Sequence, residues 1–217
     1  MPIELLTDHP IAIDSPDHQH PYGTMQDNSR DREFNRRLFA LWPGQKISVM
    51  DIGCSGGGFV KDCVDAGHFA VGLEGSDYSK IRKRAEWATI PDHLFTCDVT
   101  KPFTLLRDGK PERFHAITAW EVMEHFAEGD LSHVFANVRK HLRADGFFMG
   151  SVSFIPDVIK GVALHQTVKD REWWLAVFDR EGFVMREDIH AKFHPHWVRG
   201  GIRDVGSFNV VLGMKAN

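Results

Sequence analysis

Cysteines and long apolar stretches are both scarce in this sequence, and each scarcity argues against a class of protein. There are three cysteines among 217 residues, with no C-x-x-C pair, which argues against a disulfide framework and against a cysteine-rich zinc site. No apolar run approaches the roughly 18 residues that a membrane helix needs. The first thirty residues also lack the apolar segment of a secretion signal. We therefore expect no membrane span and a location in a reducing cytoplasm.

The sequence also lacks a strong excess of either positive or negative charge. The 26 basic and 30 acidic side chains give a formal net charge of −4, which disfavours binding to bare nucleic acid. Hydrophobic residues make up 42% of the chain and include 16 Phe, so the chain can bury a core and does not have the composition of a disordered protein. The expected partner is a small molecule or a saccharide, and the sequence leaves the oligomeric state open.

Strand and helix patterns alternate along most of the chain. Residues 1–44 are expected to form an irregular arm followed by a helix over 29–41, with the arm as a candidate lid, and residues 45–217 to form one domain. The expected strands are 47–51, 69–74, 93–96, 115–119, 147–154, 184–190 and 207–214. The expected helices are 59–66, 78–88, 130–142 and 171–181.

This alternation predicts an α/β fold with a seven-stranded, doubly wound, mostly parallel sheet and helices on both faces. The last two expected strands have no expected helix between them. We therefore expect them to form an antiparallel hairpin at one edge of the sheet.

Glycines and acids lie at the carboxyl ends of the expected strands, which is the edge where open α/β sheets bind ligands. Gly53 and the glycines after it allow a tight turn and a close approach of the backbone to a ligand. Glu74, 21 residues after Gly53, can accept two hydrogen bonds from a ribose diol. Asp51 would repel a diphosphate but suits a ligand with an amino group, and Asp98, beside the Val99 backbone, can accept from the exocyclic amine of adenine. The absence of G-x-G-x-x-G also disfavours a nicotinamide nucleotide.

Four motifs occur in order along the chain: D-I-G-C-S-G-G-G-F at 51–59, Glu74, C-D-V at 97–99 and T-A-W-E-V-M-E-H at 118–125. In order and spacing they resemble the motifs of class I S-adenosylmethionine-dependent methyltransferases, over residues 45–214. The resemblance implies a sheet whose last strand is reversed. It also implies S-adenosylmethionine as cofactor, with the methionine part at Asp51 and the glycine loop, the ribose at Glu74 and the adenine at Asp98.

The same resemblance implies a set of residues around the cofactor. They are Asp51, Gly53, Cys54, Ser55, Gly56, Glu74, Gly75, Asp98, Val99 and Trp120. Ser55 stands where many members of the family have Gly, a difference that costs little if its backbone keeps a negative φ. The arm either folds over the cofactor, with Thr24 or Asn28 in contact, or is a solvated tail.

An E-x-x-E-H sequence, from Glu121 to His125, follows the fourth expected strand. In a helix, Glu121 would share one side with Glu124 and His125. Such a group could bind a divalent cation, Mg or Mn, that lowers the pKa of an acceptor hydroxyl. Alternatively, His125 could act as a metal-free general base oriented by a Glu, or it could merely pack against the edge of the sheet. His165, after the fifth expected strand, is a second candidate base or ligand.

This E-x-x-E-H segment also resembles the metal ligands of ubiquinone-pathway O-methyltransferases and small-RNA 2′-O-methyltransferases. The candidate catalytic residues are His125, His165 and Glu121, and the candidate metal ligands are Glu121, Glu124, His125 and His165. Polar side chains such as Gln166 on the acceptor side favour an O-methyltransferase that acts on a small polar acceptor, such as a sugar hydroxyl. The alternatives are an RNA methyltransferase, which would need a basic face, and a cofactor-binding protein without catalysis.

Overall fold

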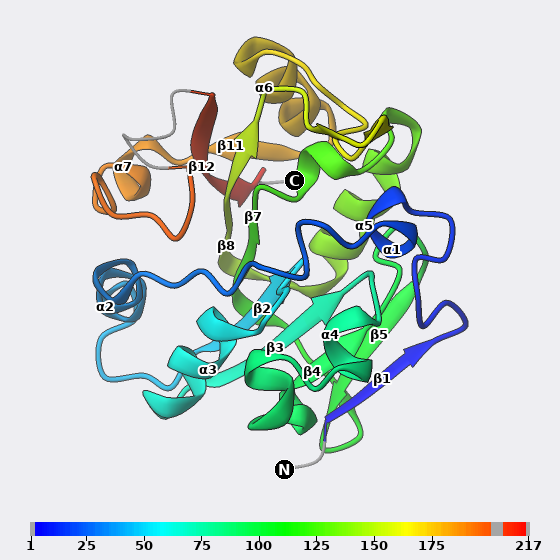
Figure 1. Cartoon of the computed structure of the whole chain (residues 1–217). Helices are drawn as coiled ribbons and strands as arrows, with labels where there is room; N and C mark the ends of the chain where they lie inside the picture. The colour runs from blue at the N-terminus through cyan, green and yellow to red at the C-terminus, as the bar shows by residue number, and fades with distance from the viewer. Residues whose placement is uncertain (1–2, 201–205, 216–217) are drawn as a thin grey trace.

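The main sheet contains seven strands in the computed structural model, which describes residues 3–200 and 206–215. They are β2 (Ser48–Ile52), β3 (Phe69–Glu74), β4 (Leu94–Thr96), β7 (Phe114–Trp120), β8 (Leu142–Ser153), β11 (Phe183–Met185) and β12 (Ser207–Met214). Their order across the sheet is β11-β12-β8-β7-β2-β3-β4 (Figure 1). Strands β4, β3, β2, β7 and β8 pair in parallel, whereas β12 is antiparallel to both β8 and β11. The predicted α/β sheet with a reversed last strand is confirmed.

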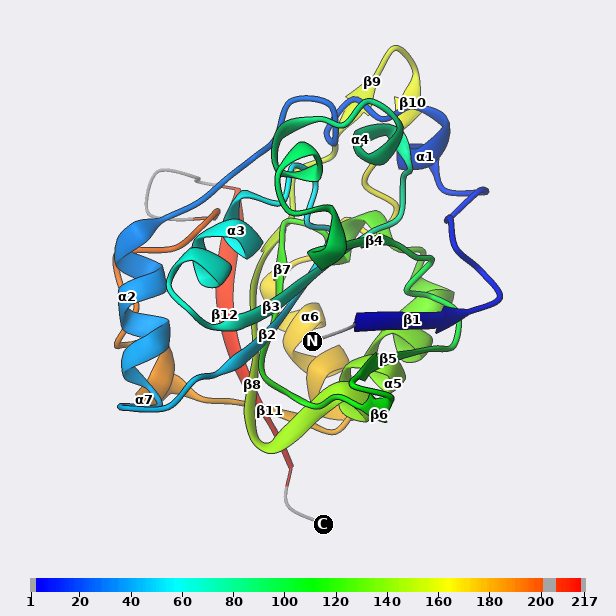
Figure 2. The ribbon, with the colours of Figure 1, turned by 90° about the horizontal axis from the view of Figure 1, so that it is seen from below.

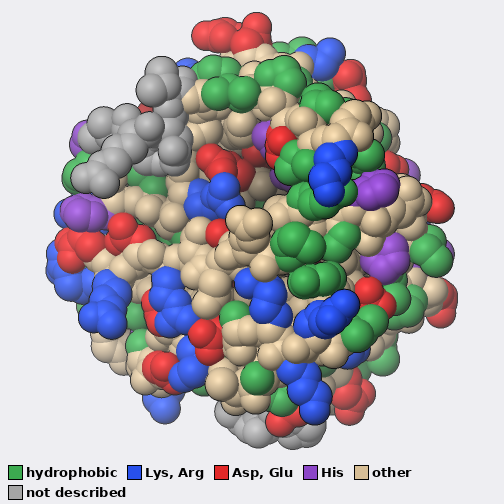
Figure 3. Space-filling model, in the orientation of Figure 1, with side chains coloured by type: hydrophobic (Ala, Val, Ile, Leu, Met, Phe, Trp, Pro, Cys, Tyr) green, Lys and Arg blue, Asp and Glu red, His purple; other side chains and the backbone are tan. Residues whose placement is uncertain are grey.

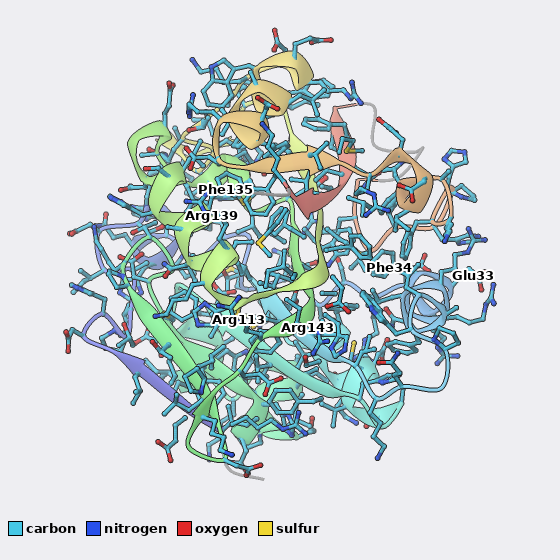
Figure 4. All side chains as sticks on the ribbon, turned by 180° about the vertical axis from the view of Figure 1, so that it is seen from behind. Glu33, Phe34, Arg113, Phe135, Arg139 and Arg143 are labelled. Atoms are coloured by element: carbon cyan, nitrogen blue, oxygen red, sulfur yellow. The ribbon has the colours of Figure 1, made fainter. Side chains whose placement is uncertain are left out.

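Helices cover both faces of this sheet (Figure 2). One face carries α2 (Arg32–Ala40), α3 (Gly58–Asp65) and α7 (Glu187–His190), and the other carries α5 (Leu131–His141) and α6 (Arg171–Arg180). Each face therefore has its own apolar core. In Figure 4, Phe34 on α2 points toward the sheet while Glu33 points outward. Phe34 and Phe135 of α5 are both fully buried, one in each core.

The expected helix over 78–88 is interrupted. It consists of α4 (Tyr78–Ile81) and a 3₁₀ turn (Ala85–Ala88), separated by left-handed backbone at Lys83 and Ala85, each with φ +48°. Between them, Arg84 donates from Nη2 to Ser55 Oγ at 2.9 Å and to the Asp27 carbonyl at 2.6 Å. These tertiary contacts override the local helical pattern, because they hold Arg84 against the glycine loop.

The expected strand over 184–190 is also wrong in its second half. The expected antiparallel pairing of the last two strands at one edge of the sheet is confirmed, because β11 pairs with β12. Strand β11 ends at Met185, however, and α7 lies between the two strands, so no short hairpin loop joins them. Helix α7 places Ile189 in the second apolar core, with 7% of its surface exposed. Burial of the Ile189 side chain in this core stabilises the helical turn.

The arm is more regular than the sequence pattern indicated. Strand β1 (Ile3–Thr7) pairs antiparallel with β5 (Phe103–Arg107), which also pairs with β6 (Lys110–Pro111). The chain then crosses over the main sheet through a short helix, α1 (Pro16–Gln19), before it reaches α2 (Figure 1). The arm therefore lies over the edge where the strands β2, β3 and β7 end.

A small hairpin, β9 (Val158–Ile159) with β10 (Val162–Ala163), follows β8. In the part of the chain that the structure describes, no helix has both the length and the apolar character to cross a membrane.

Candidate active site

A cavity of about 380 Å³ lies at the carboxyl ends of β2, β3, β4 and β7, under the arm. Ten of the fourteen candidate cofactor, catalytic and metal residues line it: Gly53, Ser55, Glu74, Gly75, Asp98, Val99, Trp120, Glu121, His125 and His165. Four others, Asp51, Cys54, Gly56 and Glu124, are not part of its wall. The structure thus brings residues from four strand ends and from the segment after β8 into one space.

The glycine loop after β2 has left-handed backbone at three positions, Gly53, Ser55 and Gly57. At Gly53, φ is +70°, and a Cβ atom would lie 2.4 Å from Val122 Cγ2, so both the conformation and the space require glycine. At Ser55, φ is +48°, so the condition under which a serine costs little in this loop is not met. Two hydrogen bonds hold the backbone of this strained residue, because its N–H donates to Glu74 Oε2 at 2.8 Å and its carbonyl accepts from Trp87 Nε1 at 2.7 Å.

Asp51 lies behind the cavity wall rather than on it. Its side chain is 4% exposed and accepts a hydrogen bond from the Thr118 hydroxyl at 2.6 Å. Burial raises the pKa of Asp51 to about 8, with the nearby charges of Asp27 and Glu74 acting in the same direction. A cation bound next to the glycine loop would therefore favour the ionised form of Asp51.

Cys54 and Gly56 have local roles in packing. The Cys54 sulfur faces Gly72 of β3, where a Cβ atom would come within 2.6 Å of it. Gly56 lies against Asn28, whose Oδ1 would be 2.4 Å from a Cβ atom at that position. Asn28 of the arm thus packs on the glycine loop outside the cavity, whereas Thr24 lines the cavity.

Two carboxylates at the ends of β3 and β4 face the cavity. Glu74 is 6% exposed and accepts from the backbone N–H groups of Ser55 and Ser76. Burial raises its pKa above the usual value, although these hydrogen bonds oppose the shift. Asp98 uses Oδ1 to accept from the backbone N–H and hydroxyl of Thr100, at 2.9 and 2.6 Å. Its position on the wall leaves the carboxylate available to a ligand.

The E-x-x-E-H segment does not form an α-helix. Only its last residues form a 3₁₀ turn (Met123–His125), and Glu121 has left-handed backbone with φ +53°. The Glu121 carboxylate lies 2.7 Å from Arg199 Nη2 instead of beside Glu124 and His125. The predicted grouping of Glu121 with the other candidate metal ligands is therefore wrong.

The remaining three candidates do come together. One ligand atom from each of Glu124, His125 and His165 lies within 4.8 Å of the others, a separation at which the three could hold one metal ion. Glu124 is fully buried and accepts from the Ser153 N–H through Oε1, while its buried Oε2 has no hydrogen-bond partner among the described residues. Burial raises the pKa of Glu124 to about 7. An unpartnered buried carboxylate oxygen calls for a cation or a proton.

Both histidines direct one nitrogen into this group. His125 Nδ1 donates to Asp17 Oδ2 at 2.9 Å, and His165 Nδ1 donates to the Ile155 carbonyl at 2.6 Å. These acceptors assign the proton to Nδ1, so Nε2 of each ring carries the lone pair with which a histidine binds a ligand. Burial lowers the pKa of His165, whereas for His125 the Asp17 carboxylate outweighs burial and raises the pKa.

The wall of the cavity is strongly acidic. Among the described residues, two cationic side chains line it, Lys101 and Arg199. Eight carboxylates line it as well: Asp14, Asp17, Asp27, Glu74, Asp98, Glu121, Asp130 and Asp157. Figure 3 shows acidic and histidine side chains together in the upper half of this face. This excess of negative charge favours cationic ligands and opposes phosphates.

Asp17 and Arg199 were not predicted as site residues. Asp17 belongs to the arm, and Arg199 follows α7, so neither lies at a strand end where ligand-binding residues are expected. Arg199 contacts Asp27 of the arm at 3.3 Å as well as Glu121. The one sequence signal for Asp17 was its place in a polar arm that contained little apolar surface to bury.

Comparison with known proteins agrees with this architecture. A family model described as a methyltransferase domain matches residues 27–191. The chain belongs to this methyltransferase family. A search of curated proteins gave no match to this methyltransferase domain.

Solved structures resemble this methyltransferase domain in fold at low sequence identity. A TehB-like methyltransferase from Corynebacterium glutamicum has a TM-score of 0.57 and 18% identity over 92% of this chain and 100% of the other. The 1,6-didemethyltoxoflavin-N1-methyltransferase of Burkholderia thailandensis, with S-adenosylhomocysteine bound, has a TM-score of 0.61 and 16% identity over 93% and 84%. The glycopeptide N-methyltransferase MtfA, in complex with S-adenosylmethionine, has a TM-score of 0.57 and 18% identity over 88% and 91%.

Proposed function

We propose that this domain binds S-adenosylmethionine in the acidic cavity and transfers its methyl group to a small polar acceptor. Glu74 accepts from the ribose hydroxyls, Asp98 from the adenine amine, and the methionine part lies along the loop at Gly53. Support comes from the position of these three residues on one wall and from the negative field, which suits a sulfonium and an ammonium group. Two of the structural relatives hold S-adenosylmethionine or S-adenosylhomocysteine.

A divalent cation, Mg or Mn, is part of this proposal. Glu124, His125 and His165 would hold it, because their donor atoms converge and the Glu124 Oε2 atom is buried without a partner among the described residues. A bound cation would lower the pKa of an acceptor hydroxyl. The observation that carries the assignment is that His125 and His165 line the same cavity as Glu74 and Asp98, so the methyl group and the acceptor oxygen can meet there.

The lining of the cavity is most compatible with a neutral hydroxyl as the acceptor, such as that of a sugar. Eight carboxylates on the wall repel phosphates, which disfavours RNA as the acceptor. A second candidate is methyl transfer to nitrogen, since two structural relatives carry the name N-methyltransferase. The third candidate is a protein that binds the cofactor but transfers no methyl group.

The three cysteines support a cytoplasmic location. All are unpaired and buried. Burial raises the pKa of the Cys97 thiol to about 12, so the group is poorly reactive. A chain with unpaired thiols and no disulfide is typical of a reducing compartment.

Methyl incorporation from labelled S-adenosylmethionine tests the proposed function. Sugar, phenol, amine and RNA acceptors would be compared with and without a chelator. We expect incorporation into hydroxyl acceptors that is lost in chelator and restored by Mn²⁺. Incorporation that persists in chelator but is lost in His125→Ala would replace the cation with a metal-free base. Incorporation into amines alone would support nitrogen as the acceptor, and binding of S-adenosylhomocysteine without turnover on any acceptor would support the non-catalytic alternative.

A further inference from the structure

The arm is anchored to the domain on both sides of the segment that covers the cavity. Before this segment, β1 pairs with β5, and the His9 carbonyl accepts from the Asp98 N–H at 3.0 Å. After it, the Ser55 hydroxyl lies 3.0 Å from the carbonyls of both Thr24 and Asp27. Two of the anchors, Ser55 and Asp98, are cavity-lining residues themselves. The position of the arm therefore depends on the residues that surround the cofactor space.

Asp17 lies in the covering segment and reaches the candidate metal group. The Ser15 side chain caps α1 by accepting from the Asp17 N–H at 3.2 Å. The Asp17 carboxylate then accepts from His125 Nδ1 at 2.9 Å, across 108 positions of sequence. Asp17 and His125 are each about one-fifth exposed, so water screens this contact only in part.

The orienting contacts of the three candidate ligands have different origins. Glu124 is held by Ser153 and His165 by Ile155, both at the end of β8 or directly after it. His125 alone is held by a residue of the arm. Carboxylates that bind the second nitrogen of a ligating histidine fix its tautomer and ring orientation, and their loss costs about 10- to 100-fold in metal affinity.

We propose that Asp17 is a positioning residue through which closure of the arm over the cofactor orders His125 for the metal. This inference rests on the proposed cation site. Since Thr24 and Asp17 of the same arm both line the cavity, a cofactor that stabilises the closed arm also stabilises the Asp17–His125 contact. Cofactor and metal then bind cooperatively, and each raises the affinity for the other by the same factor.

Calorimetric titration of the full chain with Mn²⁺, in the absence and presence of saturating S-adenosylhomocysteine, tests this coupling. For the wild type we expect S-adenosylhomocysteine to tighten Mn²⁺ binding by about 5- to 150-fold. In Asp17→Asn, Mn²⁺ affinity falls about 10- to 100-fold and no longer responds to S-adenosylhomocysteine. A cooperative thermal melt of this variant, followed by circular dichroism in chelator, excludes a general loss of folding as the cause.

Asp14→Asn is the matched control, because Asp14 lies on the same arm and lines the same cavity but is not the carboxylate bound to His125. It should retain the response of Mn²⁺ binding to S-adenosylhomocysteine. Equal losses in both variants, or an undiminished response in Asp17→Asn, would overturn the role of Asp17 while leaving the metal site intact. A wild type that binds no Mn²⁺ under either condition would instead overturn the proposed cation site, and the coupling with it.

Discussion

Glu124 and Glu121 are close in sequence but have opposite surroundings. Glu124 has a buried oxygen without a partner among the described residues and lies beside two imidazoles, whereas Glu121 is paired with Arg199 at 2.7 Å. We predict that Glu124→Gln lowers Mn²⁺ affinity by more than about 10-fold, because it replaces a charged ligand with a neutral side chain of the same size. Glu121→Gln should leave Mn²⁺ affinity unchanged. Calorimetry on both variants, with thermal melts to check folding, would contradict this assignment if the two losses were equal.

Asp51 gives the clearest pH dependence of stability. Its pKa is about 8 in the folded chain and near 3.8 when exposed, so the folded state keeps a proton that the unfolded state releases. The stabilising contribution of this proton is fully present below pH 4. As the pH rises from 4 through 8, the free energy of unfolding falls by at most about 1.4 kcal/mol per pH unit.

Asp51→Asn removes this proton while retaining an oxygen that can accept from Thr118. We predict that the variant gains stability over the wild type as the pH is raised from 5 to 9. Urea unfolding followed by circular dichroism at several pH values measures the difference. If the curves of stability against pH for the two proteins ran parallel, the Asp51 carboxyl could not have a raised pKa in the folded state.

At the scale of elements, β1 determines where the arm begins its path over the cavity. Leu5 is half-buried and packs against the apolar core that contains α5, whereas Leu6 on the opposite face of the strand is 52% exposed. We predict that Leu5→Asp destabilises the protein by about 2 kcal/mol and increases hydrogen exchange in residues 3–7 and 103–107.

Leu6→Asp is the control for this strand, since it adds the same charge on the exposed face. Its stability should stay within about 0.5 kcal/mol of the wild type, with unchanged exchange in β1 and β5. If Leu6→Asp loosened the arm as much as Leu5→Asp, packing of β1 on the core could not be what anchors it.

The elements also show what a sequence can and cannot reveal. The strands next to Gly53, Glu74 and Asp98 were predictable, since each is a short apolar run with a glycine or an acid at its carboxyl end or within two residues after it. The placement of Glu121 was not, because an i, i+3, i+4 pattern assumes an α-helix and the backbone turns left-handed at its first residue. Strand β1 was missed because its pairing partner lies about 100 positions away and five residues give little periodicity.

At the scale of the whole molecule, the cavity is formed between the edge of the sheet and the arm that covers it. Contacts between distant segments, such as Asp17 with His125 and Arg199 with Asp27, close the cavity and have no local sequence signal. The negative charge is also concentrated at this cavity. The chain as a whole has a net charge of only −4, yet eight carboxylates and two cationic side chains line one cavity. The negative field of the cavity is therefore a property of the assembled fold and not of the composition.

A crystal structure of the protein with S-adenosylhomocysteine tests the central claim most directly. We predict electron density for the ligand under the arm, with its ribose hydroxyls on Glu74, its adenine beside Asp98 and Val99, and its sulfur directed toward His125 and His165. Density for the ligand at another place on the molecule, with this cavity empty, would contradict the assignment of the cavity as the cofactor site.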